Sequence, residues 1–275
     1  MRHGNRERSH VQDRTLITSK HKRHRLITYL ILIFGVAMPM GIHSTEKKQD
    51  NGMEQTTNEK EEMPMFVYTS KEQRKIEAYI EKEFGEYQTV MHEIISPDIH
   101  VDIAVVPPTD DQPYYKLVTF GAGAFKMNVP REFGRRKLER AEYVVFLPKD
   151  WDIHSDKEED YWPIRYLKVM ARLPIECDTW LGFGHSLLAD EEGKPVAENT
   201  KFNSFLLLHS VGKENQVVEP MRLGLFSRVN FYQLYPLYQE ELDYKIEHST
   251  AGLFEKIDDD ELDFVIDINR KNFCR

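Results

Sequence analysis

One stretch of the chain, from Tyr161 to Leu188, constrains the fold more than any other, because it holds two of the three tryptophans and the clearest helical pattern. Four acidic residues lie within positions 156–160, just ahead of Pro163. Negative charge followed by an early proline is typical of a helix N-terminus, where backbone N–H groups lack partners. We therefore predict a helix that begins near Trp162 and ends at Pro174.

The spacing of apolar residues in this helix predicts that only one of its faces is buried. The apolar positions recur at steps of three and four residues: Tyr166, Leu167, Met170 and Leu173. The basic positions fall on the opposite side: Arg165, Lys168 and Arg172. This pattern is typical of a helix that packs against a core and exposes its charged residues. After the helix, large apolar residues from Trp180 to Leu188 alternate with small ones, which predicts a strand.

Composition places the chain among globular proteins of a reducing compartment. Its 275 residues, 40% of them apolar and 11% aromatic, suffice for one large domain or two small ones. The two cysteines, Cys177 and Cys274, are far apart and form no CxxC pair. This spacing indicates neither a structural zinc site nor a disulfide framework. We therefore expect a cytoplasmic protein.

The net charge of −9 is unevenly distributed along the chain. Residues 1–52 hold ten Lys and Arg against four Asp and Glu, which leaves 27 basic and 42 acidic residues in 53–275, a net charge of −15. A strongly acidic domain does not offer the basic surface that nucleic acids require. We therefore expect no direct binding to nucleic acid.

The N-terminal segment, residues 1–52, combines basic residues with an apolar span at 26–42. Seventeen residues are at the short end of what crosses a bilayer, so one interpretation is a membrane anchor. The others are a translation start at Met53, with an over-extended upstream part, and a cleaved signal peptide. The alternative to a cytoplasmic protein is thus one anchored through 26–42, and we expect membrane contact only if that span is a real anchor.

The remainder divides into a polar linker, 53–65, and a single folded domain, 66–275. A helix is predicted from Ser70 to Phe84, with Gly85 ending it. A second, acidic helix is predicted from Tyr238 to Glu261. Alternating apolar runs predict strands at residues 87–95, 100–107, 114–125, 142–148, 202–211 and 229–237. Helices and strands are mixed without strict alternation, so we predict an α+β fold with a mixed, largely antiparallel sheet packed with helices.

Three groups of residues invite a catalytic or ligand-binding interpretation. Cys177 and His185, with Asp178 nearby, are the residue types of a thiol hydrolase, but the sequence shows neither a base within reach nor oxyanion donors. The HxD pairs His100/Asp102 and His154/Asp156 supply only two metal ligands each, which do not make a site, and a buried or edge hydrogen bond is the better interpretation of Asp102. We assign no catalytic, cofactor-binding or metal-binding residue, and we expect no cofactor and no enzymatic activity.

The glycine-rich segment GAGAF, Gly121 to Phe125, resembles a phosphate-binding loop only in its glycine content. It lacks both GxxxxGK[ST] and GxGxxG. Tight packing at the end of a strand explains these glycines better than a bound phosphate does.

Five blocks, taken in order, resemble the suppressor-of-fused domain in its bacterial form. They are HVDIAVVPP, KLVTFGAGAFKMNVP, ERAEYVVFLPKDW, YWPIRYLKVMARLP and TWLGFGH, and they lie within His100 to Val211. The matching positions are Asp102, Thr119, Gly121, Gly123, Met127, Val129, Pro130, Glu142, Leu147, Pro148, Trp151, Trp162, Pro163, Trp180, Gly184 and His185. Most of these residue types build cores and tight turns.

This resemblance implies a protein-binding module without catalytic activity. Bacterial members of the family are proposed to be immunity proteins that neutralise polymorphic toxins, and the animal relative sequesters a transcription factor. We therefore expect an immunity or antitoxin protein that sequesters a proteinaceous bacterial toxin. The alternatives are a thiol-type hydrolase that uses Cys177 and His185, and a membrane-tethered binding protein without a toxin partner.

The distribution of acidic residues suggests where such a partner binds. Residues 240–267 contain eleven acids against Lys245 and Lys256, a net charge of −9. Toxins that cut nucleic acid carry basic clefts, and clustered carboxylates would attract and block such a cleft. A solvated helix face is the plainer interpretation. The candidate partner-binding residues are Asp258, Asp259, Asp260 and Glu261, and the loops Pro107–Pro113 and Ala189–Thr200 are the alternatives.

Overall fold

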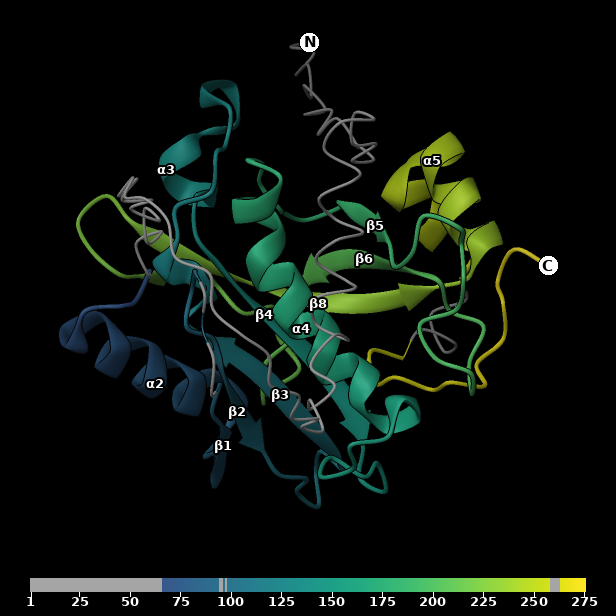
Figure 1. The fold of residues 1–275 in the computed structure, drawn as a ribbon, viewed down its shortest axis with the longest axis horizontal. Coiled ribbons are helices and arrows are strands. Elements are labelled where there is room, and N and C mark those ends of the chain that lie inside the picture. The colour runs from purple at the N-terminus through teal and green to yellow at the C-terminus, as the bar shows by residue number, and fades with distance from the viewer. Residues whose placement is uncertain (1–65, 94–95, 97, 258–262) are drawn as a thin grey trace, which may run out of the picture.

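The computed structural model describes residues 66–93, 96, 98–257 and 263–275 (Figure 1). The predicted basic segment 1–52, with its apolar span 26–42, and the predicted linker 53–65 lie outside the described residues. In the part that the structure describes, none of the helices has both the length and the apolar character needed to span a membrane.

One mixed sheet organises the described chain. Its strands are β1 (Thr89–Met91), β2 (Asp102–Val106), β3 (Tyr114–Phe120), β4 (Ala141–Pro148), β5 (Ser186–Leu188), β6 (Ser204–His209), β7 (Met221–Arg222) and β8 (Arg228–Leu237). They are ordered β1-β2-β3-β4-β8-β6-β5, and β7 pairs with β8 beside this path. Only the β4–β8 pair is parallel among these strand pairs. The predicted α+β fold with a largely antiparallel sheet is confirmed.

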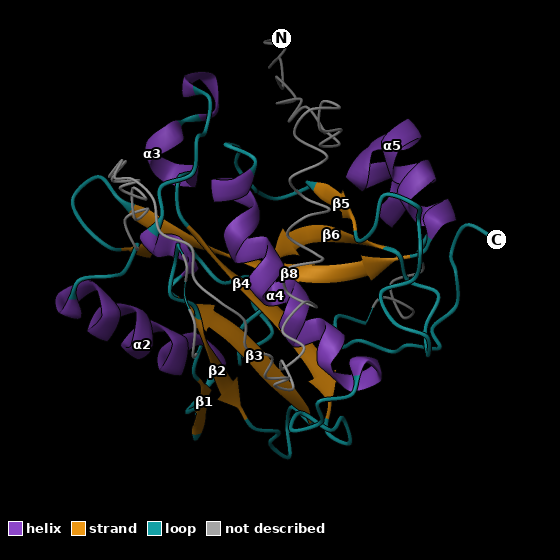
Figure 2. Cartoon of the chain, viewed as in Figure 1, coloured by secondary structure: helices purple, strands orange, loops and turns teal. Residues whose placement is uncertain are grey.

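Helices cover both faces of this sheet (Figure 2). They are α2 (Ser70–Phe84), α3 (Arg135–Leu138), α4 (Glu158–Glu176) and α5 (Gln239–Phe254), with 3-10 turns η1 (Ala122–Ala124) and η2 (Arg131–Phe133). Strand β8 shows the division, because its side chains alternate between faces. Tyr232 and Leu234 join the cluster of α4, whereas Phe231 packs with α2 and Leu237 packs with α5.

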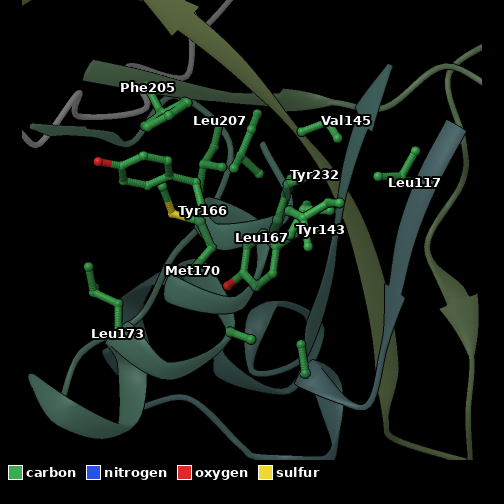
Figure 3. Close-up of a cluster of buried hydrophobic side chains, with 14 of the residues drawn as sticks. Leu117, Tyr143, Val145, Tyr166, Leu167, Met170, Leu173, Phe205, Leu207 and Tyr232 are labelled. Carbon is green, nitrogen blue, oxygen red and sulfur yellow. The ribbon is translucent and has the colours of Figure 1, made fainter. Parts of the chain in front are cut away.

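The α4 side of the sheet holds the largest apolar cluster (Figure 3). From α4 it receives Leu167, Met170 and Leu173, as the predicted stripe requires. From the sheet it receives Tyr143, Val145, Phe205, Leu207 and Tyr232. The apolar stripe predicted from the sequence is thus the face that α4 turns toward the sheet.

Helix α4 is longer than predicted at both ends. It begins at Glu158, so three of the four acidic residues, Glu158, Glu159 and Asp160, form its first turn and do not merely precede it. It also continues past Pro174 to Glu176. The proline lies in the last turn, and the N–H of Cys177 closes that turn by donating to the carbonyl of Leu173 at 2.9 Å. A proline near a helix end removes only one donor, which is why the predicted stop at Pro174 is wrong.

The predicted basic, solvated face of α4 is also wrong, because two of its arginines are buried. Arg165 is 6% exposed and donates to the carbonyl of Val196 at 3.0 Å, and it also pairs with Glu158. Arg172 is 4% exposed, and its guanidinium lies 2.6 Å from Glu93 and 3.3 Å from Asp98. Buried charges persist where they are paired and hydrogen-bonded. The acidic partners of Arg172 come from a segment remote in sequence, whereas Glu158 belongs to α4 itself.

The other predicted elements vary in accuracy. Helix α2 spans Ser70–Phe84 as predicted, although its N-cap is Thr69. The strand predicted from Trp180 shrinks to β5, because Gly184 adopts φ 81° and a turn occupies the residues before it. The acidic helix predicted to reach Glu261 ends as α5 at Phe254, and Ser249, with φ 74°, interrupts it.

Candidate partner-binding surface

The predicted partner-binding residues Asp258, Asp259, Asp260 and Glu261 lie outside the described residues. The residues on either side of this gap are packed. Ile257 is buried before it, and after it the carbonyl of Phe264 accepts a hydrogen bond from the Gln233 amide at 2.6 Å. These four acids are therefore joined on both sides to residues that contact the core.

Helix α5 carries several of the other acids that the sequence placed in this segment, and they divide into two kinds. Glu240 and Glu241 are used within the molecule, because Arg275 and Arg270 of the C-terminal tail pair with them at 2.5 Å each. The acids that remain exposed in and beyond the helix are Asp243, Glu247, Glu255, Asp263 and Asp267. Counting acids in the sequence therefore overstated the charge that this segment offers to a partner.

An open edge of the sheet lies beside α5. β5 is the last strand in the sheet order, and the Lys245 ammonium of α5 lies 3.3 Å from the Ser186 hydroxyl of β5. Leu188 is 40% exposed, and Ile246 of α5 is 52% exposed. The α5–β5 surface, which we define as α5, β5 and Glu255, thus combines exposed apolar side chains with carboxylates.

The C-terminal tail is fastened to α5 by an arginine clamp around Glu241. The two guanidinium nitrogens of Arg270 donate to the two carboxylate oxygens of Glu241 at 2.6 and 2.5 Å. The backbone N–H groups of Tyr238 and Phe273 donate to the same carboxylate at 3.0 Å. Four aromatic rings lie within 5.2 Å of the Arg270 guanidinium carbon: Phe202, Tyr235, Tyr238 and Phe273.

The glycine-rich segment forms a nest of backbone amides around a second buried carboxylate, Glu142 of β4. The N–H groups of Gly121, Ala122 and Gly123 donate to it at 3.0 to 3.2 Å. The hydroxyls of Thr119 and Tyr68 donate at 2.6 and 2.8 Å. Such nests bind anions, and here the protein's own side chain occupies the position that a phosphate would take.

The environment of Glu142 changes its acidity. Complete burial raises the pKa of Glu142 to about 7, and the hydrogen bonds from Thr119, Gly123, Tyr68 and Gly121 act in the opposite direction. The predicted tight packing of the glycines is also present. A Cβ on Gly121, which has φ 129°, would lie 2.1 Å from the His100 carbonyl oxygen. Sequence reasoning missed the role of Glu142. Its signals were one acid inside the apolar run of β4 and its place among the positions that match the suppressor-of-fused domain.

The other residues considered as metal ligands or catalytic groups, Asp102, Cys177 and His185, make structural contacts. The Asp102 carboxylate is hydrogen-bonded to the His92 ring at 3.1 Å and accepts from the Glu93 N–H at 3.0 Å, so the hydrogen-bond interpretation of Asp102 is confirmed. The His100 ring also lies 3.1 Å from it. Cys177 is 5% exposed and follows the last turn of α4. Activated cysteines are typically found at helix N-termini, so this position is the reverse of the usual one. The ring of His185 packs edge-on against Trp180, with centroids 4.3 Å apart.

The model of one protein family, described as suppressor of fused protein, matches residues 97–271, which is more than half of the chain. The chain belongs to the suppressor of fused family. The matched region includes the amide nest, α4 and α5, whereas α2 precedes it. Comparison with curated protein sequences gives no significant match.

Two solved structures of suppressor of fused proteins share the fold. One is described as a homologue from Neisseria gonorrhoeae FA 1090, with a TM-score of 0.53 and 19% identity over 74% of this chain and 98% of that one. The other belongs to a complex of Sufu with Fu, with a TM-score of 0.52 and 12% identity over 73% of this chain and 91% of that one. The suppressor of fused domain is a protein-interaction module, and that second relative is bound to another protein.

Proposed function

We propose that this suppressor of fused protein is a non-catalytic immunity protein that sequesters a proteinaceous bacterial toxin. The family supports a binding function, and the α5–β5 surface carries the proposal further. Asp243, Glu247 and Glu255 are exposed on or beside α5, and the predicted acids Asp258–Glu261 continue the same segment. A surface of this kind suits a basic partner with apolar groups of its own.

The charge of this surface would act mainly on the rate of association. Opposite charges steer two proteins toward each other before contact, and clustered carboxylates can occupy a cleft that otherwise binds phosphates. Leu188 and Ile246 would then supply apolar contacts that slow dissociation. The proposal therefore predicts a fast, salt-sensitive association with a basic toxin domain.

The test begins with the full chain as bait in a pull-down with mass spectrometry, which identifies the partner. Asp258, Asp259, Asp260 and Glu261 are then replaced by Asn and Gln, and association is followed by stopped-flow fluorescence at several salt concentrations. We expect association about tenfold slower at low salt, with a flatter salt dependence and an unchanged melting temperature.

A matched control removes the same number of charges from the two alternative loops. Asp110 and Asp111 lie in Pro107–Pro113, and Glu191 and Glu192 lie in Ala189–Thr200, and all four are exposed. Their neutralisation should change association with the partner less than twofold, as for an exposed charge outside an interface. If the control slows binding and the substitutions at Asp258–Glu261 do not, the loops form the interface and the acidic segment does not.

A further inference from the structure

The hairpin between β7 and β8 presents two large apolar side chains to solvent. Leu225 is 88% exposed and Phe226 is 65% exposed, whereas Leu223, just before them, is buried. In the part of the chain that the structure describes, no other large apolar side chain is as exposed as Leu225. We call residues 224–227 the hairpin tip. Exposed apolar residues are common on protein surfaces, so the charged groups around the tip decide what it binds.

Two arginines face each other at the base of this tip. Arg222 and Arg228 are direct partners in the β7–β8 register, so their side chains lie on the same side of the hairpin. Like charges directly opposite each other are destabilising unless an anion compensates for them. Neither guanidinium forms an ion pair with another described residue. The pair is therefore positioned to receive negative charge from outside the domain.

Helix α2 adds further basic residues near the tip. The hydroxyl of Tyr79 donates to the carbonyl of Glu219 at 2.5 Å, and the ammonium of Lys75 donates to the carbonyl of Leu223 at 3.0 Å. As the hairpin advances toward its tip, its contacts thus move toward the first turn of α2, where Lys71 and Arg74 are exposed. Figure 1 places this hairpin and α2 at one end of the molecule, and α5 at the other.

From this arrangement we propose that the hairpin tip docks the domain on an anionic phospholipid surface. Leu225 and Phe226 enter the headgroup region, and Arg222 and Arg228, with the basic residues of α2, contact lipid phosphates. The five cations, Arg222, Arg228, Lys71, Arg74 and Lys75, outnumber the acids of the same turns and hairpin, Glu72, Glu77 and Glu219, by two, in a chain region whose net charge over residues 53–275 is −15. Basic residues around an apolar wedge are the pattern that attracts a protein to anionic lipid.

The shape of the site favours a bilayer over a protein partner. The apolar residues stand at the apex of a narrow hairpin, and a bilayer accepts a projecting wedge without a matching pocket. The inference does not rest on the proposed toxin binding, and it leaves the α5–β5 surface at the far end open to a partner.

The test measures the environment of the tip itself in the full chain, so that it does not depend on whether another segment also binds lipid. Phe226→Trp is mixed with phosphatidylcholine vesicles, with and without phosphatidylglycerol, and its emission is compared with that of the unsubstituted chain. We expect a blue shift and quenching by brominated lipid only when phosphatidylglycerol is present. Adding Arg222→Gln and Arg228→Gln should raise the lipid concentration needed for half of this response about 25-fold, since each basic residue near the surface contributes about fivefold to the affinity.

Ile246→Ser provides the matched control, because it removes an exposed apolar side chain from α5 at the opposite end. In the Phe226→Trp background it should leave the response to vesicles unchanged, whereas Leu225→Ser should weaken it. Circular dichroism confirms that each variant is folded. Emission that stays typical of water with both vesicle types would overturn the proposal, and so would a blue shift that appears only on addition of a protein partner.

Discussion

Two glutamates are buried with different kinds of partner, and the contrast shows which groups can stabilise a carboxylate in the protein interior. Glu142 and Glu241 are both fully buried. Glu241 receives a full positive charge from the bidentate guanidinium of Arg270. Glu142 accepts five hydrogen bonds from hydroxyl and backbone N–H donors. One carboxylate is therefore held by a cation and the other by dipoles.

The two arrangements have different tasks in the fold. The arginine clamp joins the C-terminal tail to α5, so it holds together segments about 30 residues apart and fixes the start of the acidic helix. The amide nest closes the turn between β3 and η1 and ties it to Tyr68, just before α2. Dipoles compensate a buried charge less completely than a cation does, which agrees with the raised pKa of Glu142.

The largest effect is expected from breaking the arginine clamp. Arg270→Ala leaves Glu241 buried without its cation and removes the guanidinium from four aromatic rings. Removing one partner of a buried ion pair costs about 3–5 kcal/mol, because the remaining charge is uncompensated. We expect the free energy of unfolding to fall by about that amount in urea denaturation followed by tryptophan fluorescence.

Arg275→Ala is the control for this experiment, because Arg275 pairs with Glu240 on the same helix, although its side chain is 67% exposed. Exposed ion pairs contribute about 0–1 kcal/mol, so this variant should stay close to the unsubstituted protein. Equal losses in the two variants would mean that the tail, and not the buried charge, determines the cost.

The second effect is a dependence of stability on pH that comes from the nest. The pKa of Glu142 is about 7 in the folded protein and 4.5 in its ordinary state, so the fold favours the neutral carboxyl. The contribution of this group to stability is complete below pH 4.5 and is lost as the pH rises through 7. A shift of this size corresponds to about 3 kcal/mol. Urea denaturation at pH 5, 6, 7 and 8 should show the decline.

Glu142→Gln tests the assignment of that decline, because a glutamine does not titrate in this range. The free energy of unfolding should fall between pH 5 and pH 8 by about 3 kcal/mol less in the variant than in the unsubstituted protein. This comparison holds whatever the stability of the variant at a single pH. Parallel curves for the variant and the unsubstituted protein would assign the pH dependence to other groups.

The same two carboxylates show which parts of the structure the sequence predicts. Helix α2 was predicted over Ser70–Phe84 because an apolar stripe and Gly85 mark it locally. The nest glycines were correctly predicted to pack tightly, but their anion, Glu142, lies on the next strand. Periodicity cannot reveal a partner of this kind, because the partner is brought close only by the pairing of β3 with β4.

The errors on α4 and in the acidic segment have the same cause. Arg172 was predicted to be solvated because it lies opposite the apolar stripe, yet Glu93 and Asp98 bury it from more than 70 residues away. Glu240 was counted among the acids that segment 240–267 offers to a partner, yet Arg275 of the tail pairs with it. A charge has a local position in the sequence, but its compensation depends on tertiary structure. The predicted partner-binding residues Asp258–Glu261 remain a prediction, because they lie outside the described residues.

The smallest effect comes from removing one of the five hydrogen-bond donors to the Glu142 carboxylate. Tyr68→Phe deletes the hydroxyl that donates to Glu142 at 2.8 Å and keeps the ring in place. The carboxylate retains four donors, so the loss should be about 1 kcal/mol at pH 8, the usual net value of one hydrogen bond. This hydrogen bond also lowers the pKa of Glu142, so its removal should raise that pKa further. The pH at which the free energy of unfolding falls would then be higher than in the unsubstituted protein, which the same urea series detects. An unchanged pH profile would show that Tyr68 only fills space.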